Sequence, residues 1–123
     1  VKIVTDFARQ FSQNQSRKLP VHIWYPAQII KKSTKMKFGD FVENEKNQHW
    51  GSKSTDEILA EVIDPYVDST SVLEIIHKLK TLPVNSYKNA KPKNTKFPIV
   101  IINNGLTSTG FVQVNLAEFL ASN

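Results

Sequence analysis

The feature that most constrains the fold is a run of branched aliphatic residues that leads directly into a polar, glycine-containing turn. The run is Ile99 to Ile102; Pro98 precedes it, and Asn103, Asn104 and Gly105 follow. Such a run is typical of a strand buried on both faces, as in a parallel sheet covered by helices. Gly105 can adopt a positive φ, so the chain can turn sharply and begin a helix near Ser108. The segment therefore predicts a strand, a tight turn and a helix.

This order leaves unpaired backbone N–H groups at the carboxyl edge of a sheet, where negative charge can be held. The arrangement is typical of a catalytic loop. It is equally typical of any strand-to-helix connection, so Asn103 to Gly105 can also serve as architecture alone.

Length and composition indicate one globular domain without a membrane span. The chain has 123 residues, of which 40% are hydrophobic and 22% charged, and no apolar stretch approaches the length of a transmembrane helix. The net charge of +5 is concentrated in two stretches that read as loops, 31–37 and 88–96. Because no aromatic ladder accompanies these lysines, solvated loop charge is favoured over a nucleic-acid site.

Cysteine and histidine usage excludes several kinds of site. The sequence has no cysteine, so it holds neither a disulfide nor a thiolate metal site. The three histidines lack metal-ligand spacing, and we predict no cofactor.

The chain begins at Val1 with neither a methionine nor a signal-type segment, so we expect that an upstream part was removed. The location is unknown; a secreted or periplasmic one is compatible with this start.

The elements expected before and after the central region are two strands and a helix. Residues 1–7 predict a short strand, and residues 19–27 predict a strand with two occupied faces that ends at Pro26. Residues 111–122 predict a helix that packs on a sheet. In the predicted core, Ile99 to Ile102 are almost fully buried beneath Phe111, Leu116 and Leu120.

The intervening region, residues 28–96, contains two helical patterns. In the first, Ser54 and Glu57 have capping-box spacing; in the second, Ser71 and Glu74 repeat it. Pro65 separates the two helices, which we expect to cross near it. Pro83 ends the second helix.

The residues of the chain do not by themselves complete a catalytic motif. There is no G-x-S-x-G, and residues 105–110 have the wrong spacing for a nucleotide-binding loop. We expect His77 on a helix surface and His22 as a structural histidine in a strand. His49 beside Trp50, in a predicted loop, is a weak binding candidate.

Four segments together resemble a known enzyme group. They are SRKLPVHIWYPA at residues 16–27, MKFGDFV at 36–42, KFPIVIINNG at 96–105 and LAEFLASN at 116–123. The combination resembles the amino-terminal part of α/β-hydrolases of the platelet-activating-factor acetylhydrolase and dienelactone hydrolase type. The resemblance implies an α/β fold with an incomplete hydrolase-type sheet, in which residues 1–123 form a single partial domain and residues 28–96 a helical insertion.

The resemblance also implies a site. The backbone N–H of Leu106, held by the turn at Gly105, would be one donor of an oxyanion hole, with Asn104 and Thr107 beside the substrate. The family usually has histidine where this chain has Asn104. The nucleophile, acid and histidine of the family would lie beyond Asn123, and the partners would be a small-molecule ester and the remainder of the domain.

Two hypotheses of different classes therefore follow from the sequence. The chain is a segment of an esterase-type hydrolase, inactive alone, or it is a non-catalytic interaction module that uses the helical insertion and the basic loops.

Overall fold

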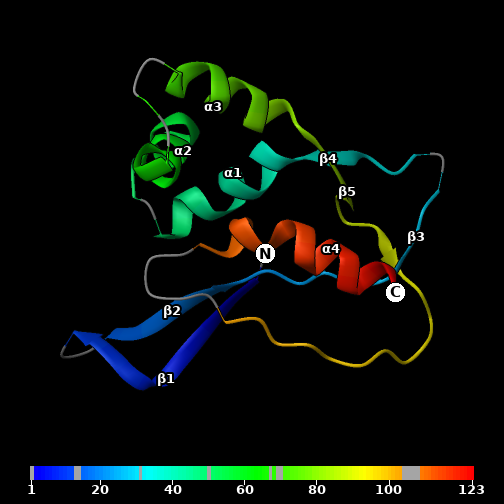
Figure 1. Cartoon of the computed structure of the whole chain (residues 1–123). Helices are drawn as coiled ribbons and strands as arrows, with labels where there is room; N and C mark the ends of the chain where they lie inside the picture. Colours follow the sequence, from blue (N-terminus) through cyan, green and yellow to red (C-terminus); the bar gives the residue numbers. More distant parts are fainter. Residues whose placement is uncertain are drawn as a thin grey trace.

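The computed structural model describes residues 2–12, 15–30, 32–49, 51–66, 68, 71–103 and 109–123, and it has mixed α and β structure (Figure 1). Three helices form one group, a β-hairpin extends from it, and a fourth helix lies between them near the carboxyl end. The elements in chain order are β1 Lys2–Ser12, β2 Gln15–Val21, β3 Ala27–Gln28, β4 Lys35–Lys37, α1 Phe38–His49, α2 Thr55–Ile63, the 3₁₀ turn η1 Asp64–Tyr66, α3 Val72–Thr81, β5 Pro83–Tyr87, β6 Lys91–Pro92, η2 Gly110–Gln113 and α4 Val114–Ser122.

The hydrophobic core lies among α1, α2, α3 and the start of the carboxyl-terminal helix. Its buried members come from seven elements: Met36, Phe41, Val42, Ile58, Leu59, Ile76, Val84, Phe111 and Val114. Phe38 meets Phe111 edge to face, with ring centroids 6.0 Å apart. The predicted insertion is therefore the centre of the described fold, and its helices pack on one another instead of covering a sheet.

Helix α2 forms as its sequence predicts. The Ser54 hydroxyl accepts a hydrogen bond from the Glu57 N–H, and the Glu57 carboxylate accepts one from the Ser54 N–H at 2.7 Å, so the capping box is complete. Ile58 and Leu59 face the core and are buried. The η1 turn at Pro65 then ends the helix.

Helix α3 confirms the second helical pattern but not its predicted cap. The Ser71 side chain makes no capping hydrogen bond with a described residue, and its backbone is already in the helical region. Glu74 instead pairs with Lys78 one turn along, at 2.6 Å. The helix ends at Thr81, before Pro83, as expected from the missing proline N–H.

Helix α1 was not among the predicted helices. Its Gly39 lies against α3, and a Cβ atom there would be 2.9 Å from the Lys80 carbonyl oxygen. The glycine lowers helix propensity but permits this close approach of two backbones. Helix formation here is thus favoured by packing, with Phe41 and Val42 buried, more than by local preference.

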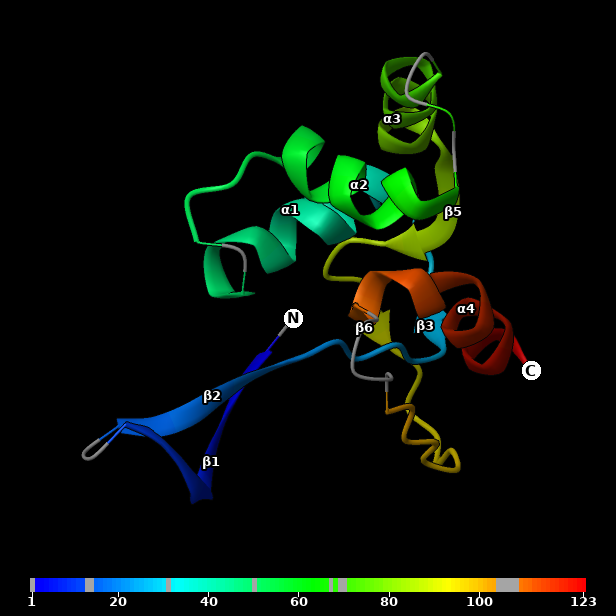
Figure 2. The same cartoon turned by 60° about the vertical axis from the view of Figure 1, so that its left-hand side comes forward.

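The strands form three separate antiparallel pairs, β1–β2, β3–β6 and β4–β5. The predicted strand at 1–7 is longer than expected and belongs to the β1–β2 hairpin, which extends away from the helices (Figure 2). The β4–β5 pair brings Lys35 opposite Tyr87, and β3–β6 brings Gln28 opposite Lys91. No parallel pair occurs among the described residues.

The predicted strand over residues 19–27 is only partly confirmed. Strand β2 ends at Val21, and residues 22–26 form no ladder. The expected alternation of faces persists, because His22 and Trp24 are half-buried whereas Ile23 and Tyr25 are exposed. The Tyr25 hydroxyl donates to the Ala90 carbonyl at 2.7 Å and so holds this segment against the chain before β6.

The prediction that Ile99 to Ile102 form a buried strand is wrong for this structure. Residues 97–103 form neither helix nor strand, and Ile99 and Ile101 are 89% and 87% exposed. A strand is stabilised by pairing with a neighbour, and no described strand lies beside this run. The segment instead follows the lower edge of the molecule, away from the helical group (Figure 1).

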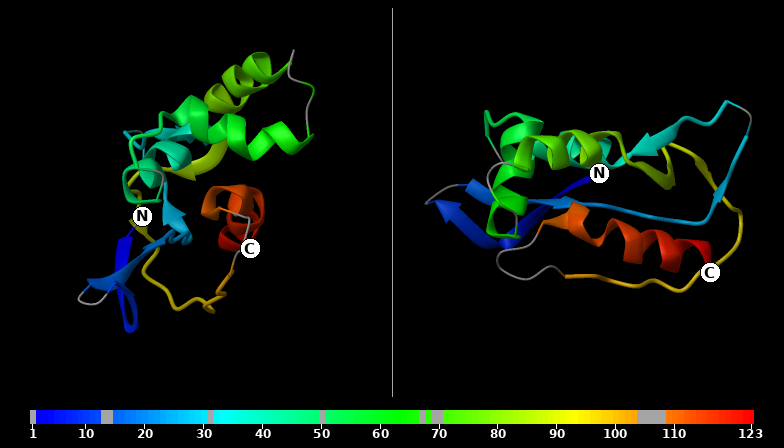
Figure 3. Two further views of the ribbon diagram at one scale, coloured as in Figure 1. Left: turned by 90° about the vertical axis from the view of Figure 1, so that its left-hand side faces the viewer. Right: turned by 45° about the horizontal axis from the view of Figure 1, so that its top comes forward.

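The predicted carboxyl-terminal helix is confirmed as η2 followed by α4, but its packing differs from the prediction. Phe111, Val114 and Ala117 are buried in the helical core. Leu116 and Leu120, expected above the aliphatic run, are 46% and 40% exposed. The two views of Figure 3 show α4 and the 93–103 segment as separate paths that are joined only through residues 104–108.

Candidate functional site

The predicted oxyanion turn lies outside the described residues. This applies to Asn104, Gly105, Leu106 and Thr107, and also to Trp50. The chain is described on both sides of the turn: the exposed aliphatic run enters it, and Thr109 follows it. The helix predicted after the turn is present, whereas the strand predicted before it is not.

Thr109 carries an unsatisfied polar atom immediately after the turn. Its Oγ1 is buried and has no hydrogen-bond partner among the described residues, although its carbonyl accepts from the Val112 N–H at 3.3 Å. Buried hydroxyl groups are normally hydrogen bonded, and leaving one unpaired costs about 1–3 kcal/mol.

A stacked aromatic group lies beside α1. The His22 and Trp24 ring centroids are 5.5 Å apart, and those of Trp24 and Phe41 are 5.7 Å apart. The Trp24 indole N–H is a second buried donor without a partner among the described residues. His22 was predicted as a structural histidine within a strand; it lies one residue after the end of β2, so the strand location is wrong, and its structural role stays a prediction.

The other two histidines belong to helices. His49 is the last residue of α1, so its predicted loop location is wrong. His77 lies exposed on α3, as predicted for a surface residue. Within the described part of the chain, no three His, Asp or Glu side chains lie close enough together to hold a metal ion.

The perturbed carboxylates are surface groups. Hydrogen bonds from the Ser54 backbone and hydroxyl lower the pKa of Glu57, and the Lys78 ammonium lowers the pKa of Glu74. Both effects favour the ionised form of exposed helix residues. Neither carboxylate has the raised pKa of a general acid.

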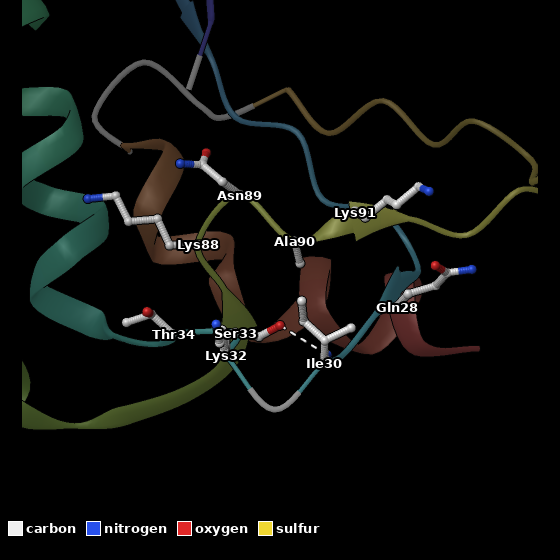
Figure 4. A pocket seen from close by; sticks show the side chains of 9 residues that line it. All are labelled: Gln28, Ile30, Lys32, Ser33, Thr34, Lys88, Asn89, Ala90 and Lys91. Atoms are coloured by element: carbon white, nitrogen blue, oxygen red, sulfur yellow. Dashed lines mark hydrogen bonds between the residues drawn. The ribbon is translucent and has the colours of Figure 1, made fainter.

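A hollow of about 270 Å³ lies between two loops (Figure 4), next to β3, which lies on the side of the molecule opposite the hairpin tip in Figure 1. Its lining comes from segments 28–34 and 88–91 and includes Lys32, Lys88 and Lys91. The sequence showed two separate lysine-rich loops. It gave no signal that the β3–β6 and β4–β5 pairs place them side by side.

Comparisons with known proteins identify no relative. No protein-family model, curated protein or solved structure matches the chain. Within the described residues, no helix combines the length and the hydropathy that crossing a bilayer requires.

Proposed function

We propose that this chain is the amino-terminal portion of a carboxylic-ester hydrolase and contributes the oxyanion loop of its active site. The observation that carries the proposal is the exposed aliphatic run at 99–102, which leads directly into the Asn-Asn-Gly turn. Apolar side chains this exposed are costly in water, at roughly 25 cal/mol for each Å² of apolar surface left uncovered. Under the proposal, strands from the remainder of the domain pair with this run and bury it in an α/β-hydrolase-type sheet.

Two further features support the same assignment. The turn is followed by η2 and α4, so a helix begins where the resemblance requires one. Among the described residues the buried Thr109 hydroxyl, directly after the turn, has no hydrogen-bond partner, and under the proposal it lies at the edge of the active site.

The chemistry assigned to the turn is stabilisation of an oxyanion. Attack on an ester places negative charge on the former carbonyl oxygen, and a fixed N–H at about 2.7–3.1 Å stabilises that transition state more than the ground state. The Leu106 N–H would be the donor, and Gly105 would allow the turn that aims it. The nucleophilic serine, its histidine and its acid are expected outside residues 1–123.

The test is hydrolysis of a short-chain aryl ester by the complete gene product and by residues 1–123 alone. We expect turnover by the complete protein and none by the isolated chain. In the complete protein, Gly105→Val forces a β-branched residue into the turn and should lower kcat by about 100-fold or more. Leu106→Met, which keeps the backbone N–H, is the matched control and should leave kcat near normal. A folded complete protein without esterase activity, or a fully active Gly105→Val variant, would refute the assignment.

The second candidate is a non-catalytic interaction module. It is favoured by Tyr66 and Leu73, which are 86% and 79% exposed on the surface of the helical group. Side chains this exposed are available to contact a partner protein. Two results together would favour this module over the hydrolase. They are the complete absence of esterase activity and a protein partner whose binding is lost in the Tyr66→Ala, Leu73→Ala variant.

A further inference from the structure

The two lysine-rich loops become one surface in the structure. Segments 26–37 and 84–97 each contain four lysines and no Asp or Glu. The Lys88 N–H donates to the Thr34 carbonyl at 3.0 Å, and the Lys93 N–H donates to the Pro26 carbonyl at 2.9 Å. We call the resulting surface the basic end and define it by Ile29, Ile30, Lys32, Lys35, Lys88, Lys91 and Lys93.

No described residue forms an ion pair that neutralises the positive charge of the basic end. All five lysines are exposed, and none of them forms an ion pair with another described residue. Asp40 at the start of α1 and Glu118 on α4 make hydrogen bonds to other groups and form no ion pair with these lysines. Asp40 accepts from the Lys37 N–H, and Glu118 accepts from the Asn85 N–H and the Ser86 hydroxyl. Such a concentration of one sign of charge attracts an anionic partner.

The shape of the basic end favours an extended partner over a small anion. In Figure 4 the side chains of Lys88 and Lys91 point to opposite sides, with Ile30 and Ala90 between them. In this arrangement the ammonium groups diverge and do not converge on one phosphate. They can instead contact many anionic groups spread over a surface.

Exposed aliphatic side chains accompany the charge. Ile29 and Ile30 are 63% and 65% exposed and belong to the same loop as Lys32. Lysines with neighbouring large aliphatic side chains suit an anionic bilayer, in which the charges meet the headgroups and the apolar groups enter the acyl boundary.

Nucleic acid fits this surface less well. Arginine and exposed aromatic rings dominate contacts to bases and phosphates. Both arginines of the chain, Arg9 and Arg17, lie in the hairpin sequence and not in the two basic segments. The nearby Tyr25 is tied to the Ala90 carbonyl through its hydroxyl.

We propose that the basic end docks on the surface of an anionic lipid bilayer, with the five lysines over the headgroups and Ile29 and Ile30 inserted between them. This docking is independent of the ester hydrolase assignment, since it uses no residue of the oxyanion turn or of the aliphatic run.

The experiment measures co-sedimentation of the 123-residue chain with vesicles. We expect binding to phosphatidylcholine vesicles that contain phosphatidylserine, weak binding to phosphatidylcholine alone, and release as salt is added. A triple variant, Lys32→Gln, Lys91→Gln and Lys93→Gln, should bind about 100-fold more weakly, at about fivefold for each lysine removed. Ile29→Ser with Ile30→Ser should cost about tenfold through lost insertion.

The matched control removes the same amount of charge elsewhere. Lys53→Gln, Lys78→Gln and Lys80→Gln act on lysines paired with Glu61, Glu74 and Asp56. This variant has the same net charge as the first triple variant and should bind like the wild type. Far-UV circular dichroism establishes that each variant is folded.

Three results would overturn the proposal. They are equal binding to neutral vesicles, equal loss of binding in the two triple variants, and tighter binding to an oligonucleotide or to polyglutamate than to the anionic vesicles. The last result would assign the basic end to a nucleic acid or to an acidic protein.

Discussion

The helical group and the aliphatic run have similar residues and opposite environments. Ile58 in α2 is fully buried, whereas Ile101 in the run is 87% exposed. A helix satisfies its own backbone and needs only one face covered, and here α1, α2 and α3 cover one another. A strand depends on neighbours for its hydrogen bonds as well as for burial, and the run has no described neighbour. Equal hydrophobicity therefore produces a core in one region and an uncovered surface in the other.

The largest expected effect is the difference in stability between two isoleucine-to-alanine variants, one in the helical core and one in the aliphatic run. Ile58→Ala removes buried side-chain atoms and leaves a cavity, so it should lower the free energy of unfolding by about 2–5 kcal/mol. Ile101→Ala removes atoms that are already in water and should change it by less than about 0.5 kcal/mol. Urea unfolding of both variants checks the difference. Equal losses would show that the run is packed as tightly as the helical core and would remove the contrast.

A smaller effect is expected at two serines of the helical group, Ser54 and Ser71, each of which is followed three residues later by a glutamate. Ser54 completes a capping box with Glu57, so Ser54→Ala should lower the free energy of unfolding by about 0.5–2 kcal/mol. Ser71 makes no capping hydrogen bond with a described residue, and Ser71→Ala should cost less than about 0.5 kcal/mol. Urea unfolding of the two variants makes the measurement. If Ser71→Ala costs as much as Ser54→Ala, the second box forms in solution and the sequence pattern was right at both helices.

The sequence predicted those parts of the fold that depend on local interactions. The two helices predicted in the 28–96 region and the helix after residue 110 appear near their expected bounds, because apolar stripes, capping residues and prolines act over a few residues. Helix α1 escaped prediction because Gly39 weakens its local signal, and its packing against Lys80 is visible only in three dimensions.

The sequence could not predict features that depend on distant partners. A run such as Ile99 to Ile102 has the composition of a buried strand, but composition does not say whether a neighbouring strand is present. The basic end escaped prediction for the same reason, because backbone pairs between residues more than fifty positions apart bring its lysines together. Of the predicted site residues, His49 is placed at the end of α1, and those of the oxyanion turn remain predictions.

Native-state hydrogen exchange on the 123-residue chain tests the central contrast most directly. We predict slow exchange at the amides of Leu59 and Val62 in α2 and of Ile76 in α3, since these lie within helices at the core. We predict exchange near the unprotected rate from Ile99 to Asn103, where no described residue pairs with the backbone. Protection of the run equal to that of the helices would contradict the account, because it would require a hydrogen-bonded, buried strand where the structure has an exposed segment that is neither helix nor strand.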